Sequence, residues 1–311
     1  MSQAFRSNET IIIGVDHGYG NIKTANFCFA AGVTAFEQEP TFKSNLLVYN
    51  GRYYLIGEEH KEFAADKMRD MDYYILTLAA IASEMNHREV FSANVHLAVG
   101  LPLTWVSKQK EAFKKYLLQN ETVDFIFRGT EYHITFADVD VFPQGFAAIA
   151  DTLHTFSGVN MLVDIGNGTM SIMYINDCRP QESKCFTEKY GTNQCMLAVR
   201  ENLMTQFGTV VEDSLIERVI QSGTAEVDEK YLSAIRATAI LYVQGIFRKL
   251  REREYNPELM RLYVVGGGSC LIKHFGQYDD GRVIIVDDIN ATAKGYEFLA
   301  EQKARKKGEQ G

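Results

Sequence analysis

GVDHGYGNIK, residues 14–23, directly follows Ile11-Ile12-Ile13, an apolar run that is typical of a buried strand. Three glycines, one carboxylate and one lysine lie together where this strand ends. The core of the stretch, Val-Asp-x-Gly-x-Gly at residues 15–20, returns at residues 163–168, about half a chain further on. The same turn therefore occurs twice, each time after a strand.

Glycine turns of this kind let backbone N–H groups approach an anion closely, because no side chain blocks the approach. Lys23 lies on the returning strand, where an extended backbone points its side chain to the same side as Asn21. A lysine there can neutralise phosphate oxygens. Carboxylates such as Asp16 and Asp164 repel a triphosphate unless a cation intervenes, and Mg²⁺ suits this role because it binds a few carboxylates and keeps several waters. The pattern predicts a phosphate site with Asp16 and Asp164 as metal ligands.

A third glycine motif, Gly266-Gly267-Gly268, follows the expected strand 261–265 and would let backbone lie against a base and an α-phosphate. Taken alone, each of the two Val-Asp-x-Gly-x-Gly turns is more typical of a plain hairpin, and a triple glycine of a flexible helix entry. Together with Lys23, the three motifs favour a nucleotide site. The turns are not a Walker A loop, because no Gly-Lys-Ser/Thr follows them, and Lys23 stands where the dinucleotide fingerprint has its third glycine.

Composition limits the class of protein. A chain of 311 residues can form two domains, and its net charge of −8 argues against direct binding to nucleic acid. Its five scattered cysteines fit reduced thiols. No apolar run reaches the ~18 residues of a membrane helix, and the N-terminus lacks a signal-peptide core. We therefore expect a cytoplasmic protein with no direct membrane contact.

The periodicity predicts an α/β fold in two halves, each of which begins with strand, glycine turn and strand. Strands are expected at 11–15, 22–30, 46–49, 52–56, 95–99, 122–128, 131–136, 139–142, 161–163, 170–175, 261–265 and 283–286. Helices are expected at 70–86, from an N-cap at Ser107, at 144–157, 194–207, 212–221, 229–253 and 290–306. Domain I would comprise residues 1–155 with the terminal segment 290–311 packed back on it, and domain II residues 156–289. The helix 144–157 would join them.

The order of these motifs resembles that of the actin and sugar-kinase ATPase superfamily. Residues 14–23 and 163–169 are similar to its two phosphate loops, and residues 264–269 to its adenosine motif. Residues 142–145 and 290–296 resemble its connecting helices. Within the superfamily, the form D-x-G-x-x-N-x-K and Gly-Leu-Pro at 100–102 are most similar to ParM-type (StbA-like) actin-like proteins of plasmid segregation.

This resemblance implies two ribonuclease-H-like domains with ATP, or GTP, and Mg²⁺ in the cleft between them. Gln144 would orient the attacking water and act with Asp16 and Asp164 as the catalytic set. Glu217 and Arg218 would contact the ribose or base. The nucleotide would otherwise be bound by Gly18, Tyr19, Gly20, Asn21, Lys23, Gly166, Asn167, Gly168, Thr169, Gly266, Gly267, Gly268 and Ser269.

The resemblance also implies a partner, namely further copies of the chain in a filament that moves plasmid DNA. DNA would be reached through an adaptor at a centromere-like site, and direct DNA contact is not expected. Two alternatives stay open. One is a small-molecule phosphotransferase, although the sequence offers no convincing catalytic aspartate for it. The other is a scaffold that binds ATP without polymerising or turning it over.

Overall fold

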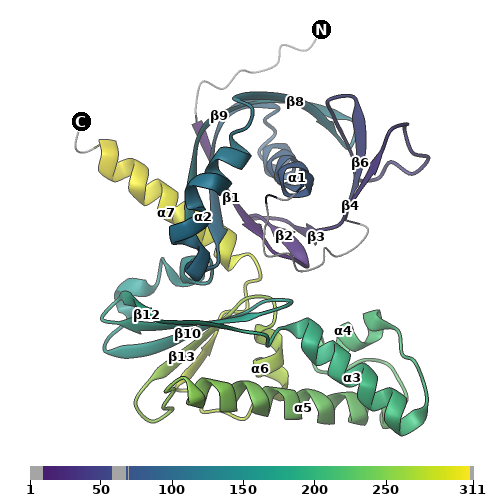
Figure 1. Ribbon diagram of the computed structural model, residues 1–311, viewed down its shortest axis with the longest axis vertical. Helices are drawn as coiled ribbons and strands as arrows, with labels where there is room; N and C mark the ends of the chain where they lie inside the picture. The colour runs from purple at the N-terminus through teal and green to yellow at the C-terminus, as the bar shows by residue number, and fades with distance from the viewer. Residues whose placement is uncertain (1–9, 58–67, 69, 309–311) are drawn as a thin grey trace. The chain divides into compact units, whose positions relative to one another are not determined.

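The computed structural model describes residues 10–57, 68 and 70–308 (Figure 1). The chain forms two compact units. Unit 1 comprises Met1–Asp151 with Asn290–Gly311, and unit 2 comprises Thr152–Ile289. Each unit has its own buried apolar core. Among the described residues, no helix combines the length and the apolar character needed to cross a bilayer.

In its described residues, unit 1 is built on a nine-stranded sheet in the order β3-β2-β1-β7-β9-β8-β5-β6-β4. The strands are β1 (Thr10–His17), β2 (Asn21–Lys23), β3 (Cys28–Ala30), β4 (Val33–Phe36), β5 (Leu46–Tyr49), β6 (Arg52–Ile56), β7 (Ser92–Leu101), β8 (Thr122–Phe127) and β9 (Thr130–Pro143). Its helices are α1 (Asp72–His87), α2 (Leu103–Leu117) and α7 (Ala291–Gly308). In α1 every residue from Tyr73 to Met85 is buried. Figure 1 shows why, because the sheet curves around this helix. A helix that is buried on all sides has no polar face to expose.

Unit 2 is built on a five-stranded sheet in the order β12-β11-β10-β13-β14. The strands are β10 (Val159–Ile165), β11 (Met170–Asn176), β12 (Arg179–Glu188), β13 (Arg261–Val265) and β14 (Val283–Ile285). Its helices are α3 (Thr192–Phe207), α4 (Asp213–Ser222), α5 (Glu229–Glu252) and α6 (Ser269–Phe275). Helix α5 packs into the core through apolar residues at helical spacing, with Leu232, Ile235, Ala239, Ile246 and Leu250 buried.

The two sheets repeat one strand plan. In unit 1, β3, β2 and β1 are antiparallel neighbours, and β7 and β9 continue in parallel. In unit 2, β12, β11 and β10 are antiparallel neighbours, and β13 and β14 continue in parallel. In each unit the Val-Asp-x-Gly-x-Gly stretch forms the turn between the first two strands along the chain, β1 and β2 in unit 1 and β10 and β11 in unit 2. The repeated sequence pattern therefore corresponds to a repeated topology.

The expected helix 144–157 is wrong. Strand β9 continues to Pro143, and only two short 3₁₀ helices follow, η1 (Phe146–Ile149) and η2 (Leu153–Thr155). The reason is Gly145, whose φ of 73° lies in the left-handed region and cannot belong to a right-handed helix. Gln144 therefore follows the end of a strand directly.

Two smaller expectations also need correction. Ser107 is not an N-cap, because α2 begins four residues earlier at Leu103, with Pro102 in the capping position. Proline suits the start of a helix, where its missing N–H has no partner to lose, so the helix extends back to it. The expected strand 22–30 is two short strands, β2 and β3, with a turn at residues 24–27.

Helix α7 packs on the rest of unit 1 through three glycines. At each of them, backbone or a large ring from the other side of the contact lies directly against the glycine Cα. A Cβ on Gly14 would lie 2.1 Å from the carbonyl oxygen of Ala293, and one on Gly295 would lie 1.8 Å from that of Ala147. A Cβ on Gly100 would lie 1.8 Å from the hydroxyl of Tyr296. Backbone cannot move aside as the end of a side chain can, so this packing needs glycine at 14 and 295.

We expect Gly295→Ala to lower the stability of unit 1 by about 2 kcal/mol or more, because the new methyl group overlaps the Ala147 carbonyl. Thermal unfolding measures the change. Gly245→Ala in α5 is the matched control, since its Cβ would come no nearer than 3.6 Å to Tyr190. By helix propensity it should leave stability unchanged or raise it by up to ~1 kcal/mol. Equal unfolding temperatures for the two variants would contradict this view of the α7 contact.

Candidate functional site

The first glycine turn connects β1 to β2 and requires glycine at its first position. Residues Asp16 and Lys23 are cross-strand neighbours, as are His17 and Ile22. The Gly18 N–H donates to the Asp16 carbonyl at 3.1 Å, and a Cβ on Gly18 would lie 2.5 Å from the Asn21 carbonyl oxygen. The turn is closed tightly, with Tyr19 and Gly20 at its tip. We call residues 16–23 loop 1.

Asp16 is the centre of a small polar cluster in unit 1. The residue is buried, and its side chain is only 10 % exposed. The Lys23 Nζ lies 3.7 Å from Oδ2, and the Gln144 Nε2 donates to Oδ1 at 3.1 Å. A buried carboxylate needs such partners, and the lysine balances its charge. Because the Gln144 amide donates through nitrogen, its carbonyl oxygen is the atom that can accept a hydrogen from a water molecule.

Asn21 and Lys23 are both half-buried, whereas Ile22 between them is fully buried. This alternation is the one expected for an extended strand. The structure therefore gathers Asp16, Lys23 and Gln144 in one cluster and places Asn21 on the Lys23 side of the strand.

The second glycine turn, residues 164–169, lies on the N-terminus of α3. Its Gly166 N–H donates to the Thr169 carbonyl at 2.8 Å. The N–H groups of Thr192 and Asn193 donate to the carbonyls of Gly166 and Asn167, at 3.1 and 2.9 Å. These first amides of α3 are thus occupied by the turn. We call residues 164–169 loop 2. An anion at loop 2 would have to be bound by backbone amides of the loop, because the first amides of α3 already donate to its carbonyls.

The triple glycine packs directly against loop 2. Gly266 has a φ of +87°, and a Cβ there would lie 2.3 Å from Oδ1 of Asp164. The Gly268 N–H donates to the Ile165 carbonyl at 2.8 Å, and a Cβ on Gly268 would lie 2.4 Å from the Ile165 side chain. Gly267 is exposed, and Ser269 is buried at the start of α6. The structure thus brings Asp164 together with residues 266–269 in unit 2.

Glu217 and Arg218 lie on α4, which is linked to loop 2 indirectly, through α6 and the triple glycine. Glu217 is half-buried and Arg218 is exposed. Helix α4 packs on α6, which begins directly after the triple glycine. In the described part of the chain, neither side chain forms a hydrogen bond or ion pair with loop 2 or the triple glycine. Their contact with a nucleotide stays a prediction.

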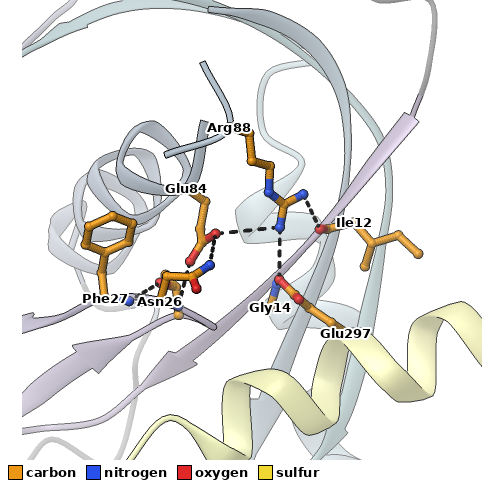
Figure 2. Close-up of polar contacts among 8 residues, drawn as sticks. Ile12, Gly14, Asn26, Phe27, Glu84, Arg88 and Glu297 are labelled. Atoms are coloured by element: carbon orange, nitrogen blue, oxygen red, sulfur yellow. Dashed lines mark hydrogen bonds and ion pairs between the residues drawn. The ribbon is translucent and has the colours of Figure 1, made fainter. Parts of the chain in front are cut away.

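A second polar network, not predicted from the sequence, supports β1 just before loop 1. Strand β2 pairs with β1 only at Asp16 and His17, and among the described residues no other strand pairs with the earlier part of that edge. Figure 2 shows what covers it. The Glu297 carboxylate of α7 accepts from the Gly14 N–H at 3.0 Å, and Arg88 donates to the Ile12 carbonyl at 3.2 Å.

The same network extends to the turn between β2 and β3. Arg88 lies 3.5 Å from Glu297 and 3.6 Å from Glu84, whose side chain is fully buried. Glu84 accepts from the backbone N–H and the side-chain amide of Asn26, both at 2.9 Å (Figure 2). A glutamate inside the apolar run of α1 is the sequence signal that could have indicated such a network. Its partner Glu297, more than 200 residues away, left no local signal.

Two families match the chain, one in each half. The family described as the N-terminal domain of actin-like proteins matches residues 14–146. The family described as the C-terminal domain of archaeal actin homologues, MreB-like, matches residues 162–276. No curated protein matches the sequence.

Solved structures resemble the chain over almost its whole length. The ADP complex of the archaeal actin homologue Ta0583 has a TM-score of 0.73 at 19% identity, covering 94% of this chain and 99% of that one. The apo ParM protein of psk41 has a TM-score of 0.73 at 18% identity, with 96% and 99% covered. A 15-stranded ParM filament from Clostridium botulinum gives 0.71 at 20% identity, with 95% and 100% covered. At such identities the likeness is one of fold.

We expect Glu297→Gln to change how stability depends on pH. Burial raises the pKa of Glu297, although the Gly14 N–H and Arg88 lower it, while Glu84 and Glu301 add to the increase. The native state therefore holds this proton more tightly than the unfolded state, and stability is lost as pH rises through the raised pKa. Glutamine keeps the acceptor for Gly14 without titrating. The stability of the variant relative to the unmodified protein should increase as pH rises from about 4, near the ordinary pKa of glutamate, through the raised pKa.

Urea unfolding across this pH range measures the difference. Glu131→Gln, which changes an exposed glutamate on β9, is the control and should show no such trend. A Glu297→Gln difference that stays constant with pH would contradict the raised pKa.

Proposed function

The chain belongs to the actin-like proteins and has their two-domain α/β fold, and on this premise we propose that it is an ATPase that polymerises with Mg²⁺ and ATP. Loop 1 and loop 2 bind the phosphates of the nucleotide. The observation that carries this proposal is the Asp16 cluster, in which a carboxylate, a lysine and a glutamine amide meet at a glycine turn. The ADP complex of Ta0583 and the filament of the botulinum ParM support it by likeness of fold.

Each residue of the cluster has a distinct role in this proposal. Lys23 neutralises phosphate oxygens as a point charge. Gln144, held by Asp16 through its nitrogen, offers its carbonyl oxygen to the attacking water, a role that a neutral amide performs in other nucleotide hydrolases. Asp16 thus both balances Lys23 and orients Gln144.

The donor set fits Mg²⁺ with ATP. Asp16 and Asp164 offer the hard carboxylate oxygens that Mg²⁺ prefers, and they would act through its water ligands. When bound, the ion supplies charge neutralisation of the phosphates. In loop 2, Asn167, Gly168 and Thr169 offer their backbone N–H groups to the phosphates, and Gly166, whose N–H donates to the Thr169 carbonyl, closes the turn at the phosphates. The triple glycine and Ser269 lie against the base and α-phosphate, and Glu217 with Arg218 against the ribose or base.

We propose further that ATP favours the subunit shape that forms a filament, and that hydrolysis weakens the filament. In this proposal the filament moves plasmid DNA through an adaptor that binds a centromere-like site. The net charge of −8 fits that division of labour, because a protein so acidic is poorly suited to direct contact with phosphates of DNA.

Light scattering and electron microscopy with ATP and Mg²⁺ test polymerisation. We expect filaments with ATP and their loss when Mg²⁺ is chelated. A protein that stays monomeric with ATP, GTP and their non-hydrolysable analogues would overturn the filament proposal. ATP turnover that requires a sugar or acid would indicate a phosphotransferase instead, and bound ATP that persists unhydrolysed would indicate a scaffold.

We expect Gln144→Ala to lower the ATPase kcat on the order of 100-fold, because water is no longer oriented. The Kd for ATP should change little, since Gln144 does not contact the phosphates in this proposal. Steady-state hydrolysis and calorimetric ATP binding measure the two constants. Gln119→Ala, an exposed glutamine on the segment after α2, is the control. Unchanged kcat in Gln144→Ala would remove Gln144 from the catalytic set.

Asp16→Ala and Asp164→Ala should each abolish most ATP hydrolysis while the protein stays folded. Asp16→Ala removes the group that orients Gln144, and both substitutions remove a carboxylate from the Mg²⁺ environment. Circular dichroism confirms folding, and phosphate release measures turnover. Normal hydrolysis by both variants would mean that the nucleotide is bound elsewhere.

A further inference from the structure

His17 is a fully buried imidazole inside loop 1, directly after Asp16 and before Gly18. It is not one of the residues that would contact the nucleotide. A buried polar ring is costly unless it is hydrogen-bonded. Its position at the base of a phosphate loop therefore calls for a physical reason.

Helix α1 supplies the hydrogen bond. The Nε2 of His17 lies 2.7 Å from the hydroxyl oxygen of Thr77, which is itself buried. The Thr77 hydroxyl donates its single proton to the Tyr73 carbonyl at 2.6 Å. Its oxygen must then accept from His17, so Nε2 carries the imidazole proton.

Two aromatic rings hold the imidazole from the sides. The ring of Tyr73 on α1 meets it edge-on with centroids 5.9 Å apart, and that of Phe113 on α2 does so at 5.6 Å. Both contacts have the T-shaped geometry that aromatic pairs prefer. His17 is thus fastened to two helices at once.

Strand geometry links this anchor to the nucleotide site. Neighbouring side chains on a strand point to opposite faces. The pair His17 and Ile22 faces the core, where both are fully buried, so the adjacent pair Asp16 and Lys23 must face the other side. Holding His17 on the core face therefore keeps Asp16 and Lys23 on the opposite face of the strand pair, where Gln144 contacts Asp16.

We propose that His17, held by Thr77, is a positioning residue that sets the orientation of loop 1 for the nucleotide. This inference rests on the proposed role of loop 1 in binding ATP. Without the bond from Nε2 to Thr77, the end of β1 can rotate, and the side chains of Asp16 and Lys23 lose their fixed direction. The effect should therefore appear in nucleotide binding as well as in stability.

Thr77→Val tests the proposal, because it keeps the shape of the side chain and removes the acceptor. We expect the KM for ATP with Mg²⁺ and the calorimetric Kd to rise about tenfold, a change of about 1.4 kcal/mol. Thr77→Ser keeps the hydroxyl and should restore both constants to within about threefold.

Ser83→Ala is the matched control. Ser83 is also buried on α1, and its hydroxyl also donates to a carbonyl four residues earlier, that of Ala79 at 2.8 Å. This hydrogen bond lies within α1 and does not involve loop 1. A purely structural role for Thr77 would make Thr77→Val and Ser83→Ala lower the unfolding temperature alike, with no change in KM.

A double-mutant cycle with His17→Leu sharpens the result. If the two residues act through one bond, the increase in KM for the double variant should equal that of either single variant. Unchanged KM in Thr77→Val, or additive increases in the double variant, would overturn the proposal while leaving ATP binding by loop 1 intact. Failure of the unmodified protein to bind ATP would instead overturn the proposed function together with this inference.

Discussion

Antiparallel pairing of β1 with β2 at two positions is the constraint on which the candidate site depends. It opposes Asp16 to Lys23 and His17 to Ile22. Because side chains alternate along a strand, one pair enters the core and the other faces the site. A shift of one residue would turn the aspartate and lysine toward the apolar core and the histidine and isoleucine toward the site. The apolar core thereby specifies the direction in which the polar residues point.

Loop 1 and loop 2 share a sequence pattern but are held by different physical means. Loop 1 is held by side chains, with His17 bonded to Thr77, and by Glu297 and Arg88 at the adjoining edge of β1. Loop 2 is held by backbone, through hydrogen bonds to α3 and close contact with the glycines at 266 and 268. Side-chain anchors can be removed by single substitutions that leave the backbone path unchanged. A loop held by backbone is disturbed mainly by adding a side chain to a glycine.

The terminal helix α7 belongs structurally to the beginning of the chain. It contacts β1 at Gly14 and η1 at Ala147, and it supplies the carboxylate that covers the free edge of β1. Arg88 joins this carboxylate to the buried Glu84, so one guanidinium serves two acidic groups. Burial without full charge balance explains why the pKa of Glu297 is raised even though a cation lies nearby.

Sequence alone was sufficient for features whose cause is local. The two glycine turns, helix α5 and the short turn between the expected strands 46–49 and 52–56 follow from periodicity and turn chemistry. Both residues of that short turn, Asn50 and Gly51, have the positive φ that a tight hairpin requires. The alternation of Asn21, Ile22 and Lys23 follows from strand geometry. The sequence also contains Gly145, yet the helix expected across this residue was wrong. The left-handed conformation of Gly145 depends on where strand β9 ends, which the local sequence does not determine.

Only the tertiary structure decided which distant groups meet. Thr77 is 60 residues from His17, Gln144 is 128 from Asp16, and Glu297 is 283 from Gly14. No local pattern encodes such pairs, since each depends on how helices pack on the sheet and which strand edges stay uncovered. Short-range preferences select strands, turns and helices, whereas long-range packing selects the partners of buried polar groups. In the protein interior each donor and acceptor needs a partner other than bulk water, and packing decides which group lies close enough.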